Sequence, residues 1–184
     1  MRRMSFKFPR LRLSMSGIRL SSIGLIFLIG LLAISSCEKD DICVDGDTPL
    51  LIIRFYNAAD STALKSVASL RIIGIGNGEP VDTFTDRSST DSVAVPLRIN
   101  EISTQFQIIL NSDGDDDAET GNIDTLQFNY ETNEVFISRA CGFVANYEIE
   151  TDTLTVDTDN WIQGIEITNP SVTSQDSAHV KIFH

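Results

Sequence analysis

Apolar residues recur along the chain in two patterns, and each predicts a different kind of segment. From residue 49 onward, short runs alternate apolar and polar side chains with a period of two, as at residues 106–110, 126–130 and 143–149. Because successive side chains of a strand point to opposite faces, these runs predict half-buried β-strands. Residues 23–34 are instead apolar without interruption, which predicts a segment of another class.

The alternating segments fill residues 49–184 and predict a single all-β domain. Residues 50–56 are apolar on both faces apart from Arg54 and suit a central strand, whereas Pro96 favours an edge position or a bulge because proline cannot donate a ladder hydrogen bond. Turn residues at 76–80 and at 131–134 predict two hairpins. About nine or ten strands of this kind predict a two-sheet β-sandwich.

One short segment departs from the strand pattern. Residues 61–68 follow Asp60, whose side chain can cap a helix N-terminus, and they predict a short helix. This helix would be the exception in an otherwise all-β domain.

The apolar segment at residues 23–34 predicts a signal peptide that is cleaved. Its length fits an h-region of about 7 to 15 residues and falls short of the roughly 20 that a membrane-spanning helix needs. The motif Ile34-Ser35-Ser36-Cys37 follows and resembles the lipobox of bacterial lipoproteins. Residues 1–36 are therefore expected to be removed and Cys37 to be lipidated. An ordinary secretory signal with a chance cysteine is the alternative.

Residues 37–48 predict a lipidated N-terminus and a short acidic tether. Within it, Lys39-Asp40-Asp41 resembles the export signal that follows the lipidated cysteine of surface lipoproteins in Bacteroidota. A solvated spacer would contain much the same charges. The expected location is the outer membrane, either at the cell surface or on the periplasmic face.

Removal of the leader makes the chain strongly acidic. Six of the 14 basic residues and none of the 26 acidic residues precede Cys37, so eight basic residues remain and the net charge changes from −12 to −18. Such a field repels nucleic acid and favours cations or basic partner surfaces, although it also serves simply to keep an exported domain soluble. The expected partners are the membrane, through the N-terminal lipid, and an envelope protein.

Cys43 and Cys141 are the two cysteines that remain once Cys37 carries lipid. In an oxidising compartment, one disulfide between them is the simplest expectation. A zinc site is disfavoured, because it needs four ligands and the two histidines, His179 and His184, lie at the far end of the sequence.

Acidic residues are concentrated in one loop-like segment. Asp113, Asp115, Asp117 and Asp124 stand at relative positions 1, 3, 5 and 12, as in Asp-x-Asp-x-Asp loops that bind calcium. Two features depart from that pattern, because Ala118 replaces the glycine of the sharp turn and Asp124 replaces the long bidentate glutamate. Calcium is a candidate cofactor here, against the alternative of a solvated hairpin loop whose like charges keep it extended.

The remaining candidates for chemistry are weak. Gly74, Gly76 and Gly78 resemble part of a phosphate-binding loop, but Glu79 and Pro80 follow them where a helix would be needed, so a turn is expected. Ser-His-Asp catalysis would have to use one of the two histidines, and the sequence has no nucleophile-elbow motif.

Four aromatic residues could line a sugar-binding or peptide-binding site, but their alternating positions are more typical of a sandwich core. They are Tyr56, Tyr130, Tyr147 and Trp161. The chain is therefore expected not to be an enzyme, and a calcium-dependent or glycan-binding module is the alternative to a structural or protein-interaction module. A hydrolase is the weakest alternative.

Several short motifs together resemble a family of Bacteroidota lipoproteins of unknown function. They are the run from Cys37 to Cys43, Thr48-Pro49-Leu50, the run from Ser138 to Phe143, Trp161-Ile162 and the run from His179 to Ile182. The resemblance covers nearly the whole chain after the leader. It implies a lipoprotein in which Cys43 pairs with Cys141, and it implies no particular activity.

Overall fold

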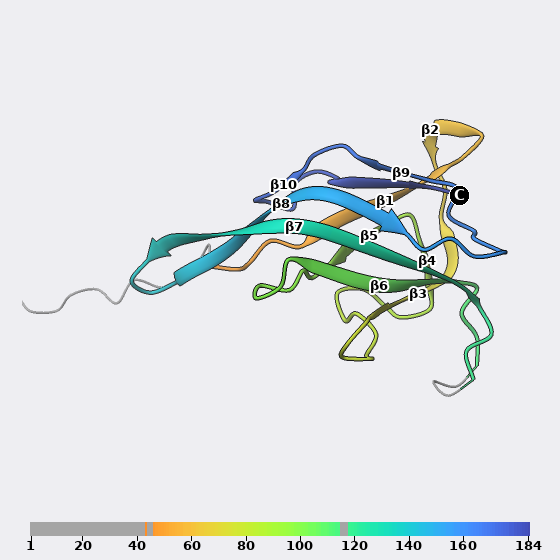
Figure 1. The fold of residues 1–184 in the computed structure, drawn as a ribbon, viewed down its shortest axis with the longest axis horizontal. Helices are drawn as coiled ribbons and strands as arrows, with labels where there is room; N and C mark the ends of the chain where they lie inside the picture. Colours follow the sequence, from red (N-terminus) through yellow and green to blue (C-terminus); the bar gives the residue numbers. More distant parts are fainter. Residues whose placement is uncertain (1–42, 44–45, 115–117) are drawn as a thin grey trace, which may run out of the picture. The chain divides into compact units, whose positions relative to one another are not determined.

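The structure is a computed structural model that describes residues 43, 46–114 and 118–184. Within these residues it is an all-β domain of eleven strands in two sheets (Figure 1), which confirms the predicted fold class. No helix capable of crossing a membrane occurs in the described part of the chain. The predicted leader, residues 1–36, lies outside the described residues. So do several predicted site residues, namely Cys37, Lys39, Asp40, Asp41, Asp115 and Asp117.

The first sheet has five strands arranged around a buried central one. They are β1 (Leu51–Asn57), β2 (Asp60–Leu64), β5 (Ser92–Val95), β9 (Gly164–Ile167) and β11 (Val180–Phe183). β1 pairs in parallel with β11 and antiparallel with β2 and β5, and β9 pairs with the far side of β11. β5 ends directly before Pro96 at the edge of this sheet, as its proline predicted.

The second sheet has six strands, and all of its pairs are antiparallel. In spatial order they are β10 (Ser171–Val172), β8 (Gly142–Leu154), β7 (Asn122–Ser138), β6 (Ser103–Leu110), β3 (Val67–Gly74) and β4 (Ser88–Thr90). The alternation along β6, along β7 up to Tyr130 and along β8 from Ala145 to Ile149 places every second side chain in the core, as predicted. Phe143, expected on the same face as Ala145, is instead exposed.

Apolar and aromatic side chains from the inner faces of both sheets form the core. Leu51, Ile53 and Phe55 of β1 are fully buried, and so are Leu126 and Phe128 of β7. The aromatic pairs are Phe55 with Trp161, Phe106 with Phe128, and Tyr130 with Tyr147, at ring-centroid distances of 6.3, 6.5 and 5.2 Å. Three of the four aromatic residues considered for a sugar site are therefore core residues, and Tyr56 packs half-buried against Phe183.

The predicted helix at residues 61–68 is wrong, because this segment forms β2 and the start of β3. The Asp60 carboxylate accepts hydrogen bonds from the backbone nitrogen and hydroxyl of Thr62, so it stabilises a tight turn. β2 folds back on β1, where Tyr56 pairs with Leu64. The hairpin predicted around residues 76–80 is reduced to a single bridge between Ile73 and Pro80.

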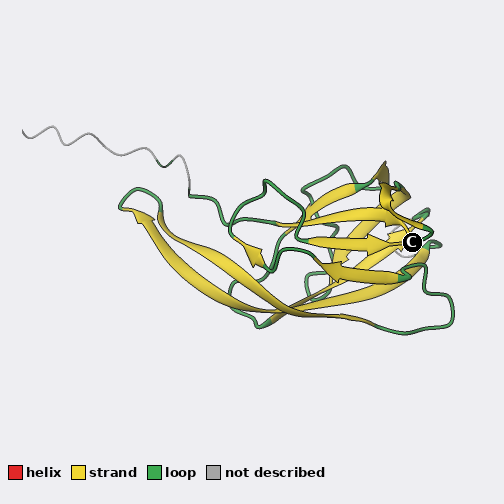
Figure 2. Cartoon of the chain, turned by 90° about the horizontal axis from the view of Figure 1, so that it is seen from above, coloured by secondary structure: helices red, strands yellow, loops and turns green. Residues whose placement is uncertain are grey.

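The predicted turn at residues 131–134 is also wrong, because β7 continues through it to Ser138. Residues 131–136 pair with β8 one by one, from Glu131 opposite Glu148 to Phe136 opposite Phe143. The chain reverses only before Gly142, whose φ of 72° favours glycine. We call residues 131–146 the arm and the rest of the two sheets the body; Figure 2 shows the arm extending beyond the body.

Candidate functional site

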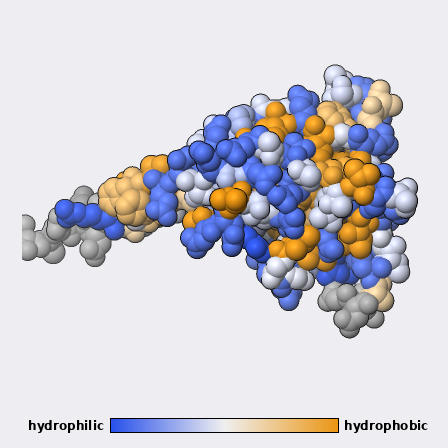
Figure 3. Space-filling view, viewed as in Figure 1, coloured by the Kyte–Doolittle hydropathy of each residue, from blue (hydrophilic) through white to orange (hydrophobic). Residues whose placement is uncertain are grey.

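The arm carries the largest group of exposed apolar side chains among the described residues. Eight large apolar side chains are exposed in that part of the chain, and four belong to the arm: Val135, Phe136, Ile137 and Phe143. Phe136 and Phe143 are 55% and 67% exposed and contact each other edge to face, with ring centroids 5.3 Å apart. Figure 3 shows apolar residues gathered toward the outer end of the arm. Exposed groups of this kind mark interaction sites.

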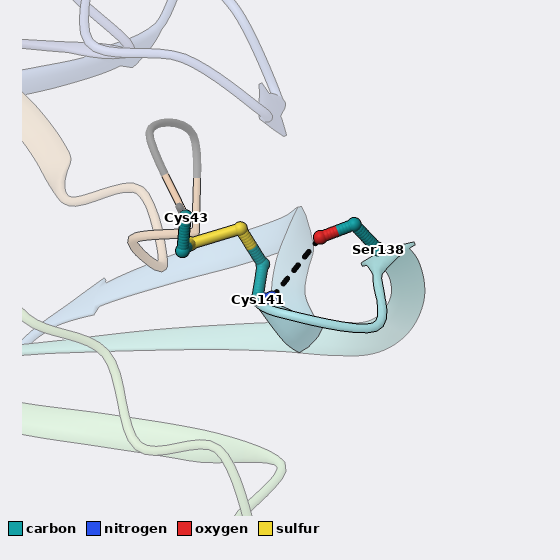
Figure 4. Close-up of a disulfide and its surroundings, with 3 residues drawn as sticks. All are labelled: Cys43, Ser138 and Cys141. Atoms are coloured by element: carbon teal, nitrogen blue, oxygen red, sulfur yellow. Dashed lines mark hydrogen bonds between the residues drawn. A yellow bond between two sulfur atoms is a disulfide. The ribbon is translucent and has the colours of Figure 1, made fainter. Parts of the chain in front are cut away.

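A disulfide closes the outer end of the arm. Cys141 in the turn is bonded to Cys43, with Cα atoms 4.9 Å apart and a sequence separation of 98, which confirms the predicted disulfide (Figure 4). The Cys141 backbone nitrogen donates a hydrogen bond to Ser138 Oγ at 3.1 Å. The start of the described chain is therefore fixed covalently to the end of the arm.

Gly46 allows the chain to pass closely over this disulfide. A Cβ at this position would collide with Cys43 Sγ and lie 3.1 Å from Cys141 Sγ. Beyond it, Thr48 Oγ1 accepts a hydrogen bond from the Ala145 backbone nitrogen at 3.4 Å. The segment that leads into β1 thus lies beside β8.

The outer end of the arm also differs from the rest of the chain in charge. Residues 135–147 contain no acidic residue, although the chain has 26, and their one charged side chain is the exposed Arg139. Acidic residues begin again at Glu134 and Glu148, where the arm approaches the body. The arm therefore ends in an apolar surface with a single positive charge.

The two predicted calcium ligands that the structure describes, Asp113 and Asp124, lie at the opposite end of β7. Asp113 is exposed and its Oδ1 accepts a hydrogen bond from the Gly114 nitrogen at 2.8 Å. Asp124 is fully buried; its oxygens accept hydrogen bonds from the Ile162 nitrogen at 2.8 Å and from Asn160 Nδ2 at 3.0 Å. Burial raises the pKa of Asp124, although these hydrogen bonds oppose the rise. Asp124 therefore fixes the connection between β8 and β9 onto β7.

No cluster of three or more His, Cys, Asp or Glu side chains suited to a metal occurs among residues 43, 46–114 and 118–184. Two of the four predicted ligands, Asp115 and Asp117, lie outside those residues. The calcium site therefore stays a prediction.

Glu119 is the acidic residue that organises this loop, and the sequence pattern did not single it out. Its carboxylate accepts hydrogen bonds from Ser112 Oγ at 2.7 Å and from the Gly121 nitrogen at 2.9 Å. Ion pairs of 3.7 and 3.8 Å join it to Arg71 and Arg87. Burial acts to raise the pKa of Glu119, but the hydrogen bonds that it accepts outweigh burial and lower it. The loop is thereby tied to β3 and to the turn before β4.

Both histidines are buried and bonded to the main chain. His179 Nδ1 accepts a hydrogen bond from the Ile52 nitrogen at 2.9 Å, and His184 Nε2 lies 3.1 Å from the Lys65 carbonyl oxygen. Burial lowers the pKa of each histidine below its ordinary value. Each histidine therefore has a clear packing role.

A hollow of about 350 Å³ opens beside the 76–80 turn. Asn77, Arg98 and Phe106 are among its lining residues. Arg98 is fixed by two hydrogen bonds. Its guanidinium donates to the Ile75 carbonyl, and its backbone oxygen accepts from Tyr130 Oη at 2.8 Å. The arrangement supports the turn and indicates no particular ligand.

Comparison with known proteins gives one match. The model of a family described as "Family of unknown function (DUF6452)" matches residues 69–184, which include the whole arm and Cys141 but not Cys43. Searches of curated proteins and of solved structures found no match.

Proposed function

We propose that this chain, which belongs to the DUF6452 family of unknown function, is a lipid-anchored, non-catalytic structural or protein-interaction module of the outer membrane of Bacteroidota. The observation that carries the proposal is the order of basic leader, apolar segment and Ile34-Ser35-Ser36-Cys37 motif. Cleavage before Cys37 and lipidation of its thiol would leave the domain tethered to a bilayer. Each buried methylene of the acyl chains would contribute about 0.8 kcal/mol to that attachment.

The disulfide supports an exported location. Cys43 and Cys141 are bonded, and disulfides persist in oxidising compartments such as the periplasm and the cell surface. The tether between Cys37 and Cys43 contains only residues 38–42, so the domain would stay close to the membrane.

A non-catalytic role is supported by how the buried titratable groups are used. His179, Asp124 and Glu119 each accept hydrogen bonds from the backbone. His179 and Asp124, which the sequence offered as candidates for chemistry, and Glu119, which it did not single out, therefore all stabilise the fold. The acidic surface favours a basic partner or a cation over nucleic acid.

Metabolic labelling tests the anchor. Wild-type protein should incorporate labelled palmitate and sediment with outer membranes, whereas Cys37→Ser should do neither. A Cys43→Ser plus Cys141→Ser variant is the matched control, because it removes two thiols but keeps Cys37 and should still be labelled. Palmitate in the Cys37→Ser protein would refute the proposed anchor.

Protease treatment of intact cells then decides which face of the outer membrane the domain occupies. If Lys39-Asp40-Asp41 directs surface export, wild-type protein should be degraded and a Lys39→Ala, Asp40→Ala, Asp41→Ala variant should be protected. Protection of both would assign the domain to the periplasmic face.

A further inference from the structure

We infer that the outer end of the arm inserts Phe136, Phe143 and Ile137 into the lipid interface beside the anchor. This inference rests on the proposed lipidation of Cys37. It adds a second membrane contact, made by protein side chains, to the covalent one.

The length of the tether places the arm at the membrane. Cys37 and Cys43 are six residues apart, and a fully extended chain spans at most about 3.6 Å per residue. The disulfide holds the Cα atoms of Cys141 and Cys43 4.9 Å apart, so Cys141 in the turn of the arm stays within about 27 Å of the anchored residue. The body is attached at the other end of the arm and can lie farther from the bilayer.

The chemistry of the outer arm suits a lipid interface. Phe136 and Phe143 form one apolar face of the ribbon, while Ile137 lies in the bulge beside them. Apolar and aromatic side chains gain free energy when they leave water for the headgroup and acyl boundary. Arg139 in the turn can pair with lipid phosphates.

The backbone of the arm limits how deep it can insert. Beyond Tyr130, whose backbone nitrogen donates to the Ile102 carbonyl, β7 has no described pairing with β6 and pairs only with β8. Unpaired backbone groups along that edge are costly in hydrocarbon, so the arm should stop in the interfacial layer. The acidic residues nearest the outer end of the arm, Glu134 and Glu148, would then remain in water.

Tryptophan fluorescence tests the insertion directly. Lipidated full-length Phe136→Trp protein is reconstituted into phosphatidylcholine and phosphatidylethanolamine vesicles, with or without brominated acyl chains. We expect a blue shift of the added emission and its quenching by the brominated lipid. Val156→Trp is the matched control, because Val156 follows the far end of β8 and is 86% exposed; its emission should stay unshifted and unquenched. Wild-type protein supplies the background of the buried Trp161.

The outcomes separate this inference from the proposed anchor. Wild-type protein that is not lipidated and does not bind vesicles would refute the anchor. Vesicle-bound Phe136→Trp protein whose emission is neither shifted nor quenched would refute the insertion alone. A blue shift that appears only in native membranes would assign the surface to a protein partner. A blue shift that grows with protein density but is not quenched by brominated lipid would assign the surface to a second copy of the chain. Either result would also refute the insertion. Phe143→Trp serves as a second probe if Phe136→Trp fails to fold.

Discussion

The two halves of β7 belong to one strand but are held in different ways. From Asn122 to Asn129 the strand pairs with β6, and from Leu126 to Asn129 it lies between β6 and β8, with its inward side chains buried against the other sheet. From Glu131 to Ser138 it pairs with β8 alone, and most of its side chains are exposed on both faces. Two-stranded ribbons are marginally stable in water. The first half is therefore stabilised by burial, and the second depends on the disulfide and a few cross-strand contacts.

The sharpest test of this difference applies one substitution to both halves. Phe128 is fully buried and Phe136 is 55% exposed, eight positions apart on the same strand. Phe128→Ala should lower the free energy of unfolding by about 3 to 5 kcal/mol, because it leaves a cavity in the core. Phe136→Ala should lower it by less than about 1 kcal/mol, since it removes an exposed aromatic contact. Denaturant titration measures both, and equal losses would contradict the comparison.

Removal of the disulfide is the next largest change. A Cys43→Ser plus Cys141→Ser variant should lose about 2 to 4 kcal/mol of stability, because the bond joins residues separated by 98 positions and so closes a long loop in the unfolded chain. Locally, hydrogen exchange of arm amides should accelerate far more than exchange of the β6 and β3 amides. Uniform acceleration in both regions would show that the arm is not the part that depends on the bond.

A smaller effect is the change of stability with pH, which arises from a buried histidine of the body. Burial lowers the pKa of His179 below 6.5, so the unfolded chain takes up the proton first and stability falls as the pH falls through about 6.5 toward the folded pKa. His179→Asn keeps an acceptor for the Ile52 nitrogen without titrating, so it should lose less stability between pH 7.5 and pH 5 than the wild type. Urea unfolding at the two pH values measures these losses. Identical losses of stability in the variant and the wild type would argue against His179 as a source of the pH dependence.

The smallest expected effect concerns the acidic loop at the other end of β7. We expect calcium to raise the melting temperature no more than magnesium at matched ionic strength, because a solvated loop responds only to screening. A specific site saturated a hundredfold above its dissociation constant would instead add about 2.7 kcal/mol. A calcium-specific rise that disappears in Asp115→Ala plus Asp117→Ala would overturn the expectation and favour the ion-dependent binding module.

The strands of the body could be predicted from the sequence because burial of one strand face requires apolar and polar residues to alternate. Residues 106–110 and 126–130 alternate since one face of each strand is buried, and that alternation is visible in a single sequence. The arm has no facing sheet, so Glu131 to Glu134 show no such constraint and resemble a turn. The helix predicted at residues 61–68 failed for a related reason: pairing with β1, a tertiary interaction, overrides the cap signal of Asp60.

The candidate site was predictable only in part. The cysteine count indicated the disulfide, but the exposure of Phe136 depends on whether another sheet lies opposite, which no local pattern reports. One signal was present: Val135, Phe136 and Ile137 are apolar at consecutive positions, so a strand with one buried face would have to expose at least one of them. Glu119 escaped notice because its partners, Arg71 and Arg87, are distant in sequence.

The parallel pairing of β1 with β11 has a consequence for the order of folding. Ile52 and His179, which are hydrogen-bonded at this junction, are 127 residues apart, whereas β6, β7 and β8 are joined to one another as antiparallel neighbours along the chain. Closing so long a loop is slow, and chains emerge from synthesis N-terminus first. The central strand of the first sheet must therefore wait, unpaired on one side, until residues 180–183 are available. Pulse-labelled hydrogen exchange should find the β6–β7 amides protected before those of β1.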